Sequence, residues 1–88
     1  MKHQLKSRKL LANNIKYYRL KKGLSQEELA ELLETTPVYL SSLENAKRNI
    51  RIDYVEHIAN TLEVNIKDLF TEREKIENKK RPRRKKIK

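Results

Sequence analysis

"GLSQEELAELLETTPVYLSSLE", residues 23–44, contains the starts of two short helices. Ser25-Gln26-Glu27-Glu28 has the S-x-x-E form of a capping box, which predicts that a helix begins there. Thr36 followed by Pro37 predicts a second start, with Thr36 as the N-cap and Pro37 at the first helical position. Only Glu34-Thr35-Thr36 is left between the two helices. Helices joined by so tight a turn cross at a steep angle, which is helix-turn-helix geometry.

The rest of the segment from Leu10 to Phe70 also has apolar residues at helical spacing, without convincing strand alternation. A first helix is predicted to end at Lys22, because Gly23 can adopt the left-handed conformation that follows a helix C-terminus. A fourth helix and a short fifth one, capped by Asn65, follow the quoted stretch. We therefore predict an all-α domain of five short helices over residues 8–72. Its defining apolar residues are Leu11, Ile15, Tyr18, Leu29, Ala30, Leu33, Leu40, Leu43, Ile52, Val55, Ile58, Ala59, Leu62, Ile66, Leu69 and Phe70.

The positive charge of the chain is concentrated at its C-terminal end. The net charge is +10, and residues 71–88 carry +7 of it. In "KKRPRRKKIK", residues 79–88, eight of the ten residues are basic. Such a run repels itself and buries little apolar area, so residues 73–88 are predicted to be a disordered basic tail with polyanionic partners. A non-specific DNA-binding arm, a solubility-enhancing end and an RNA-binding segment all remain open.

Several classes of protein are not expected from the composition. The chain has no Cys, which excludes disulfides and thiolate zinc sites, and its two His residues, His3 and His57, lie far apart. No nucleophile–base pattern or glycine-rich phosphate loop is present, so we expect no enzyme activity, cofactor, metal or small-molecule ligand. No apolar run approaches the ~18 residues of a membrane span, and the N-terminus lacks a signal-peptide pattern. We expect a cytoplasmic protein.

Two stretches of the chain, "LKKGLSQEELAELLETTPVYLSSLENAKRN" and "IANTLEVNIKDLF", resemble the Cro/cI-type (XRE) helix-turn-helix family of phage and bacterial repressors. The resemblance covers about residues 10–70. It implies a lambda-repressor-like fold and a transcriptional regulator, associated with the nucleoid, that binds a palindromic double-stranded DNA operator as a homodimer. "PVYLSSLENAKRNI" further resembles the small controller proteins of restriction–modification systems.

The resemblance also assigns roles to individual residues. Gln26 matches a glutamine that contacts a phosphate, and Arg19 pairs with Glu44 near the DNA-facing surface. The exposed face of the third helix, which enters the major groove in this family, carries Thr36, Pro37, Val38, Tyr39 and Ser42. The following loop, which tracks the DNA backbone, carries Asn45, Lys47 and Arg48. The dimer candidates are Tyr54, Ile66, Leu69 and Phe70, and core packing is the competing explanation for the last three.

Val38 and Tyr39 are unusual residues for a DNA-reading helix. Val38 can contact a thymine methyl group, and the Tyr39 hydroxyl can donate to a phosphate or a base edge. Burial within the domain and contact with another protein are the alternatives. Pro37 donates no hydrogen bond, so we expect DNA shape to contribute more to specificity than usual.

Three other positions depart from the family pattern. Glu34 and Ala46 stand where the family commonly has Gly, and Arg51 replaces a Ser or Thr N-cap. A non-glycine residue with positive φ costs about 1–2 kcal/mol, so the turn at Glu34 is expected to be strained unless its conformation differs. Because Ala46 replaces a common Gly, the loop after the third helix is also expected to be reshaped.

Overall fold

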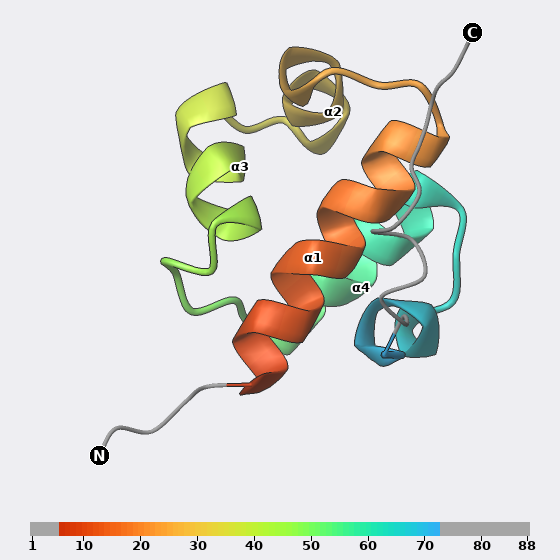
Figure 1. The fold of residues 1–88 in the computed structure, drawn as a ribbon. Helices are drawn as coiled ribbons and strands as arrows, with labels where there is room; N and C mark the ends of the chain where they lie inside the picture. The colour runs from red at the N-terminus through yellow and green to blue at the C-terminus, as the bar shows by residue number, and fades with distance from the viewer. Residues whose placement is uncertain (1–5, 73–88) are drawn as a thin grey trace, which may run out of the picture.

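The computed structural model describes residues 6–72, and these form four α-helices followed by one 3-10 helix (Figure 1). The elements are α1 (Lys6–Lys21), α2 (Gln26–Leu33), α3 (Pro37–Glu44), α4 (Ile52–Leu62) and η1 (Ile66–Phe70). The predicted all-α helix-turn-helix fold is confirmed, with the difference that the fifth helix is a 3-10 helix. The predicted basic tail, residues 73–88, lies outside the described residues.

The two helix starts of the quoted stretch form as their residues predict. The Ser25 hydroxyl accepts a hydrogen bond from the Glu28 backbone N–H at 3.0 Å, and the Glu28 carboxylate accepts one from the Ser25 N–H at 2.8 Å. This reciprocal pair is the predicted capping box. At α3 the Thr36 hydroxyl accepts from the Tyr39 N–H at 3.1 Å, directly before Pro37. Local side-chain chemistry therefore fixes both ends of the helix-turn-helix turn.

Within residues 6–72, four residues adopt the left-handed conformation, and three of them are not glycine. Gly23 has a φ of +75°, as expected just beyond a helix C-terminus, although α1 ends at Lys21 and not at the predicted Lys22. Glu34, Ala46 and Glu63 have φ values of 61°, 59° and 64°. Glu34 and Ala46 thus keep the backbone that a glycine would adopt, and the loops are not reshaped to avoid it. Arg51, at the start of α4, makes no side-chain cap hydrogen bond, which agrees with the loss of Ser or Thr there.

The core is one continuous cluster of side chains from all five elements. Its fully or nearly fully buried apolar members are Leu11, Ala12, Ile15, Leu29, Ala30, Leu33, Leu40, Leu43, Val55, Ile58, Ala59, Leu62 and Leu69. Most of the residues predicted to define the helices therefore face inward. Ile52 is an exception, because it opens α4 and its side chain is 63 % exposed.

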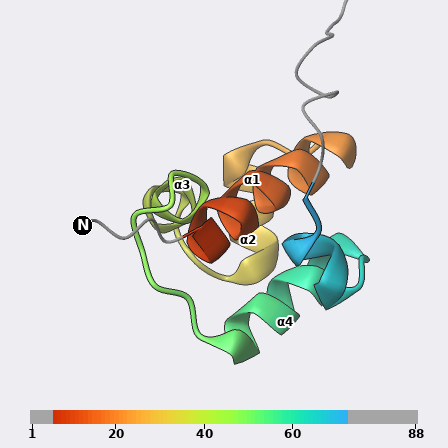
Figure 2. The ribbon, with the colours of Figure 1, turned by 60° about the horizontal axis from the view of Figure 1, so that its bottom comes forward.

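Helix α1 lies through the middle of the molecule, with α3 and η1 on opposite sides of it (Figures 1 and 2). On one side, the buried Asn14 amide nitrogen donates to the carbonyl oxygens of Leu69 and Thr71, each at 2.9 Å, and so ties the end of η1 to α1. Helix η1 does not cover the outer face of α3, because α3 lies on the other side of α1. The fold thus presents α3 at one edge of the domain.

Candidate nucleic-acid interface

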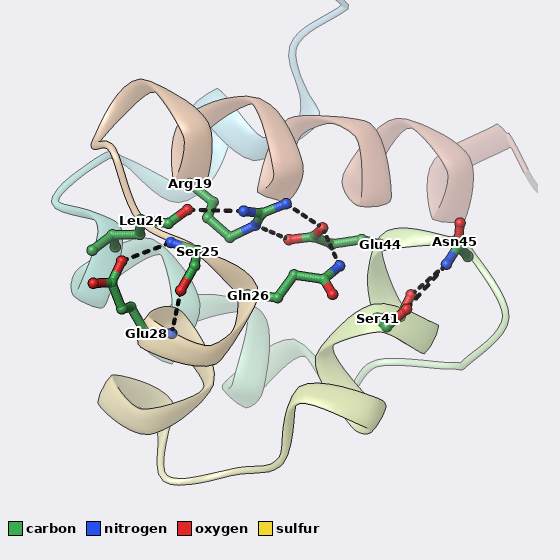
Figure 3. Close-up of polar contacts among 8 residues, drawn as sticks. All are labelled: Arg19, Leu24, Ser25, Gln26, Glu28, Ser41, Glu44 and Asn45. Atoms are coloured by element: carbon green, nitrogen blue, oxygen red, sulfur yellow. Dashed lines mark hydrogen bonds and ion pairs between the residues drawn. The ribbon is translucent and has the colours of Figure 1, made fainter.

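Arg19 and Glu44 form a buried ion pair behind the outer face of α3. Arg19 Nε lies 2.7 Å from Glu44 Oε2, and Arg19 Nη2 donates to Glu44 Oε1 at 3.0 Å. The Arg19 and Glu44 side chains are only 7 % and 3 % exposed, and Arg19 Nη1 donates to the Leu24 carbonyl at 2.8 Å (Figure 3). The two parallel bonds give a charge-assisted, geometrically fixed contact. The predicted Arg19–Glu44 pairing is confirmed.

Gln26 joins this pair from the first residue of α2. Its amide nitrogen donates to Glu44 Oε1 at 3.0 Å, so Glu44 holds residues of both α1 and α2 (Figure 3). A carboxamide nitrogen carries two hydrogens, which leaves Gln26 one further N–H to donate. The network therefore fixes the direction of the Gln26 side chain at the start of α2. Phosphate contacts by Gln26 and Arg19 stay predictions.

A shallow hollow lies along the outer face of α3 and the start of α2. Val38, with 77 % of its surface exposed, lies at its edge. The hollow brings together most of the residues predicted for DNA contact, and it adds Ser41. Ser41 follows Pro37 by four residues, so counting the helical repeat further would have found it. The residues that line the hollow are Gln26, Pro37, Val38, Ser41, Ser42, Asn45 and Lys47.

The structure separates Val38 from its neighbour Tyr39. Val38 points to solvent, whereas Tyr39 is half-buried, packs against the core cluster and makes an edge contact with Tyr54 at a ring-centroid distance of 6.1 Å. Partial burial, one of the alternatives left open by the sequence, therefore applies to Tyr39. Thr36 is exposed, and its hydroxyl oxygen is engaged in capping α3.

The loop after α3 places two cations beside this hollow. Lys47 and Arg48 are both exposed, and Arg48 Nε donates to the Ser42 hydroxyl at 3.1 Å. Asn45 donates from its side-chain amide to the Ser41 carbonyl at 2.8 Å, which already accepts from the Asn45 backbone N–H at 3.0 Å, so the Asn45 side chain folds back over the end of α3. Because the nearby Glu44 carboxylate is buried and paired with Arg19, it opposes little of the positive charge of the loop. The arrangement suits a polyanion.

The four dimer candidates do not form one surface. Leu69 is fully buried in the core of the domain, so its assignment as a dimer contact is wrong; packing against α1 and α4 uses its side chain. Tyr54 is half-buried beside Tyr39 and His57, and burial raises its pKa. Ile66 and Phe70 remain 36 % and 38 % exposed.

Phe70 also lines an apolar groove that the sequence did not predict. The groove has a volume of about 560 Å³, and exposed Ile52 contributes to its wall. Tyr54 does not line it. The groove is lined by Lys6, Ser7, Arg8, Leu11, Asn49, Ile50, Ile52, Val55 and Phe70.

Comparison with known proteins agrees with this geometry. Residues 15–69, which run from the middle of α1 to η1, match the helix-turn-helix family HTH_3. The chain belongs to this family. Among its relatives, the HTH-type transcriptional regulator SinR of Bacillus licheniformis is 36 % identical over 69 residues, which are 77 % of this chain and 62 % of SinR. The control protein C.MunI of Mycoplasma sp is 38 % identical over 64 residues, which are 72 % of this chain and 86 % of C.MunI.

A solved structure of SinR in complex with DNA superimposes on this domain with a TM-score of 0.64 at 35 % identity. The superposition covers 69 % of this chain and 98 % of that one. The match to SinR as a whole protein spans less than two thirds of its length. The similarity therefore concerns the helix-turn-helix domain.

Residues 6–72 contain neither a candidate metal site nor a candidate membrane span. Within this range no three His, Asp or Glu side chains gather in a way that could hold a metal ion. None of the helices described is long and apolar enough to cross a membrane.

Proposed function

We propose that the protein is a sequence-specific transcriptional regulator that binds a palindromic double-stranded DNA operator as a homodimer, in the cytoplasm at the nucleoid. The observation that carries this proposal is the uncovered outer face of α3, backed by the buried Arg19–Glu44–Gln26 network. The family membership supports it, as do relatives described as a transcriptional regulator and as a control protein. SinR, solved with DNA, has the same domain fold.

In the proposed complex the N-terminal half of α3 enters the major groove, as the second helix of a helix-turn-helix does. Val38 is the exposed apolar residue there and contacts a thymine methyl group. Gln26, at the positive end of the α2 dipole, donates its free N–H to a phosphate. Lys47 contacts the backbone beyond α3 and adds affinity that does not depend on sequence.

The homodimer is proposed to form through the exposed apolar side chains of η1. Ile66 and Phe70 are the candidates, and the groove beside Phe70 extends the apolar surface to Ile52. Helix η1 itself lies on the opposite side of α1 from α3 (Figures 1 and 2), whereas the groove also reaches Asn49 and Ile50 in the loop that follows α3. Sedimentation of the full chain tests the idea: a dimer that Phe70→Glu converts to monomer supports it, and a wild-type monomer bound singly to DNA contradicts it.

Selection from a random DNA library with the full-length protein tests sequence-specific binding. The wild type is expected to enrich a palindrome, and Val38→Ala is expected to relax one A·T position in each half-site. Leu32→Ala is the matched control, because Leu32 is also an exposed apolar residue, 55 % accessible, but lies outside the hollow. It should enrich the wild-type motif.

The same selection distinguishes the alternatives. Tight binding at low salt without any enriched motif would indicate a general nucleic-acid binder driven by the basic tail. Absence of DNA binding even at low salt would favour a protein-interaction module with Val38 in its contact surface, since low salt strengthens every phosphate contact.

A further inference from the structure

Arg48 is restrained against α3 at two points, although it is an exposed residue of a loop. Its Nε donates to the Ser42 hydroxyl at 3.1 Å, and its guanidinium carbon lies 5.2 Å from the centre of the Tyr39 ring. A cation at this distance from an aromatic ring is attracted to the ring face. Together the two contacts hold the guanidinium plane in one orientation before any ligand arrives.

Both partners of Arg48 are themselves fixed. The Ser42 hydroxyl donates to the Tyr39 carbonyl at 2.6 Å, so its proton is committed and its oxygen is left to accept from Arg48. The Tyr39 ring is half-buried and makes an edge contact with Tyr54, whose ring lies 5.6 Å from that of His57. The guanidinium is therefore the outer end of a series of side-chain contacts that runs from α4 through α3 to the loop.

The restraints leave one particular edge of the guanidinium for a ligand. The contacts described for Arg48 are the Nε hydrogen bond and the approach of the guanidinium carbon to the Tyr39 ring, so the two terminal nitrogens, Nη1 and Nη2, are left. This pair of parallel donors matches the O6 and N7 acceptors of guanine in the major groove. Ser42 lines the hollow on α3, which places the fork at the edge of the DNA-facing surface.

A phosphate contact would not require this restraint. Lys47, the neighbouring residue, supplies a flexible charge for the backbone, whereas discrimination between bases needs donors in a fixed geometry. We infer that Arg48 reads a guanine of the operator and that Ser42 and Tyr39 are its positioning residues. The inference rests on the proposed DNA-binding function and adds a base-reading residue to it.

The test is library selection with the full-length wild type, Arg48→Lys and Ser42→Ala, each first checked for folding by its thermal melt. The wild-type motif should contain a guanine that Arg48→Lys no longer selects, with preference for that base pair reduced about 10-fold or more. Because Arg48→Lys keeps the charge, the salt dependence of binding should stay unchanged. Ser42→Ala keeps Arg48 but removes its restraint, so it should weaken the same guanine and no other position.

Arg51→Lys is the matched control, because Arg51 is exposed and makes no side-chain cap hydrogen bond. It should leave the motif intact. If Arg48→Lys lowers affinity for all sequences equally, or leaves every position of the motif unchanged, Arg48 does not read a base and the inference is overturned. A wild type that enriches no motif would instead overturn the proposed function, and this inference with it.

Discussion

The left-handed backbone conformation of Glu34 costs free energy that a substitution could recover. Glu34 ends α2 with a φ of 61° and a ψ of 44°, and its backbone N–H bonds to the carbonyl oxygens of the last turn. Left-handed conformations are unfavourable for residues with a Cβ atom, whereas glycine adopts them freely. The turn between α2 and α3 therefore holds Glu34 in an unfavourable backbone conformation, at a local cost in folding free energy.

Glu34→Gly is expected to stabilise the domain by about 0.5–1 kcal/mol, since the relief of strain exceeds the extra backbone entropy that glycine loses on folding. Urea unfolding followed by circular dichroism measures the change. Glu56→Gly is the control, because Glu56 is an exposed residue inside α4, and there the same substitution should destabilise by about 1 kcal/mol. Destabilisation by both variants would show that Glu34 is not strained.

Glu63 provides a residue-scale prediction about pH. Its carboxylate accepts a hydrogen bond from Lys22 Nζ at 2.7 Å, and this bond and the positive charge lower the pKa of Glu63 below its ordinary value of 4.5. A lowered folded-state pKa stabilises the fold above pH 4.5, and the contribution is lost as the pH falls through the folded-state value. Lys22→Met should therefore raise the Glu63 pKa, as measured by NMR titration of its carboxyl carbon. Lys21→Met should leave the Glu63 pKa unchanged. An equal pKa shift in both variants would contradict a specific contact between Lys22 and Glu63.

At the scale of elements, the Arg19–Glu44 pair fastens α1 to α3. Glu44→Ala would leave the Arg19 guanidinium buried without its carboxylate, which typically destabilises by about 3–5 kcal/mol. Arg19→Met/Glu44→Ala removes both charges and is expected to be more stable than Glu44→Ala alone. Chemical denaturation of the single and double variants tests this coupling. Additive losses would mean that the pair does not act as a unit.

Asn14 fastens η1 to α1 in a comparable way. Asn14→Leu removes the donor for the Leu69 and Thr71 carbonyl oxygens and is expected to destabilise by about 1–3 kcal/mol. Amide hydrogen exchange should accelerate most in residues 66–71, because they lose their attachment to α1. Asn13→Leu, at the exposed neighbouring position, should change neither the stability nor the hydrogen-exchange rates. Uniform acceleration across all helices would indicate global destabilisation instead of release of η1.

The elements that the sequence predicted well are those set by local chemistry. The Ser25 capping box and the Thr36-Pro37 start depend on residues within one helical turn, so their spacing sufficed. The burial of Leu69 in a five-residue 3-10 segment and the half-burial of Tyr39 depend on which helices pack against them. The Arg48 contacts with Ser42 and Tyr39 likewise require the loop to fold back onto α3. Such tertiary contacts cannot be read from helical spacing.

For the whole molecule, the arrangement about α1 keeps two surfaces apart. The hollow on α3 contains polar, cationic and isolated apolar side chains, whereas the surface around η1 exposes Ile66 and Phe70. Because α3 and η1 lie on opposite sides of α1 (Figure 2) and contribute different residues, DNA contact and self-association need not compete for the same side chains. A two-fold dimer that presents both copies of α3 on one face, about one helical turn of DNA apart, would match a palindrome by its own symmetry.

The distribution of charge over the whole chain predicts how affinity and specificity are divided. Residues 1–70 carry a net charge of only +3, whereas residues 79–88 alone contain eight basic residues. We expect the tail to supply affinity through phosphate contacts and α3 to supply sequence preference. Each tail residue that neutralises a phosphate should steepen the dependence of log K on log salt by about 0.9.

Deletion of residues 79–88 should therefore weaken binding to every DNA sequence and reduce the salt slope by several units, since each lost phosphate contact removes about 0.9. The motif selected from a random library should stay the same, because the hollow on α3 is unaltered. Replacing the eight basic residues by serine at constant length is the control for chain length, and it should reproduce the deletion. Loss of the motif itself in the shortened protein would mean that the tail takes part in base recognition, and affinity and specificity would then not be separable in this chain.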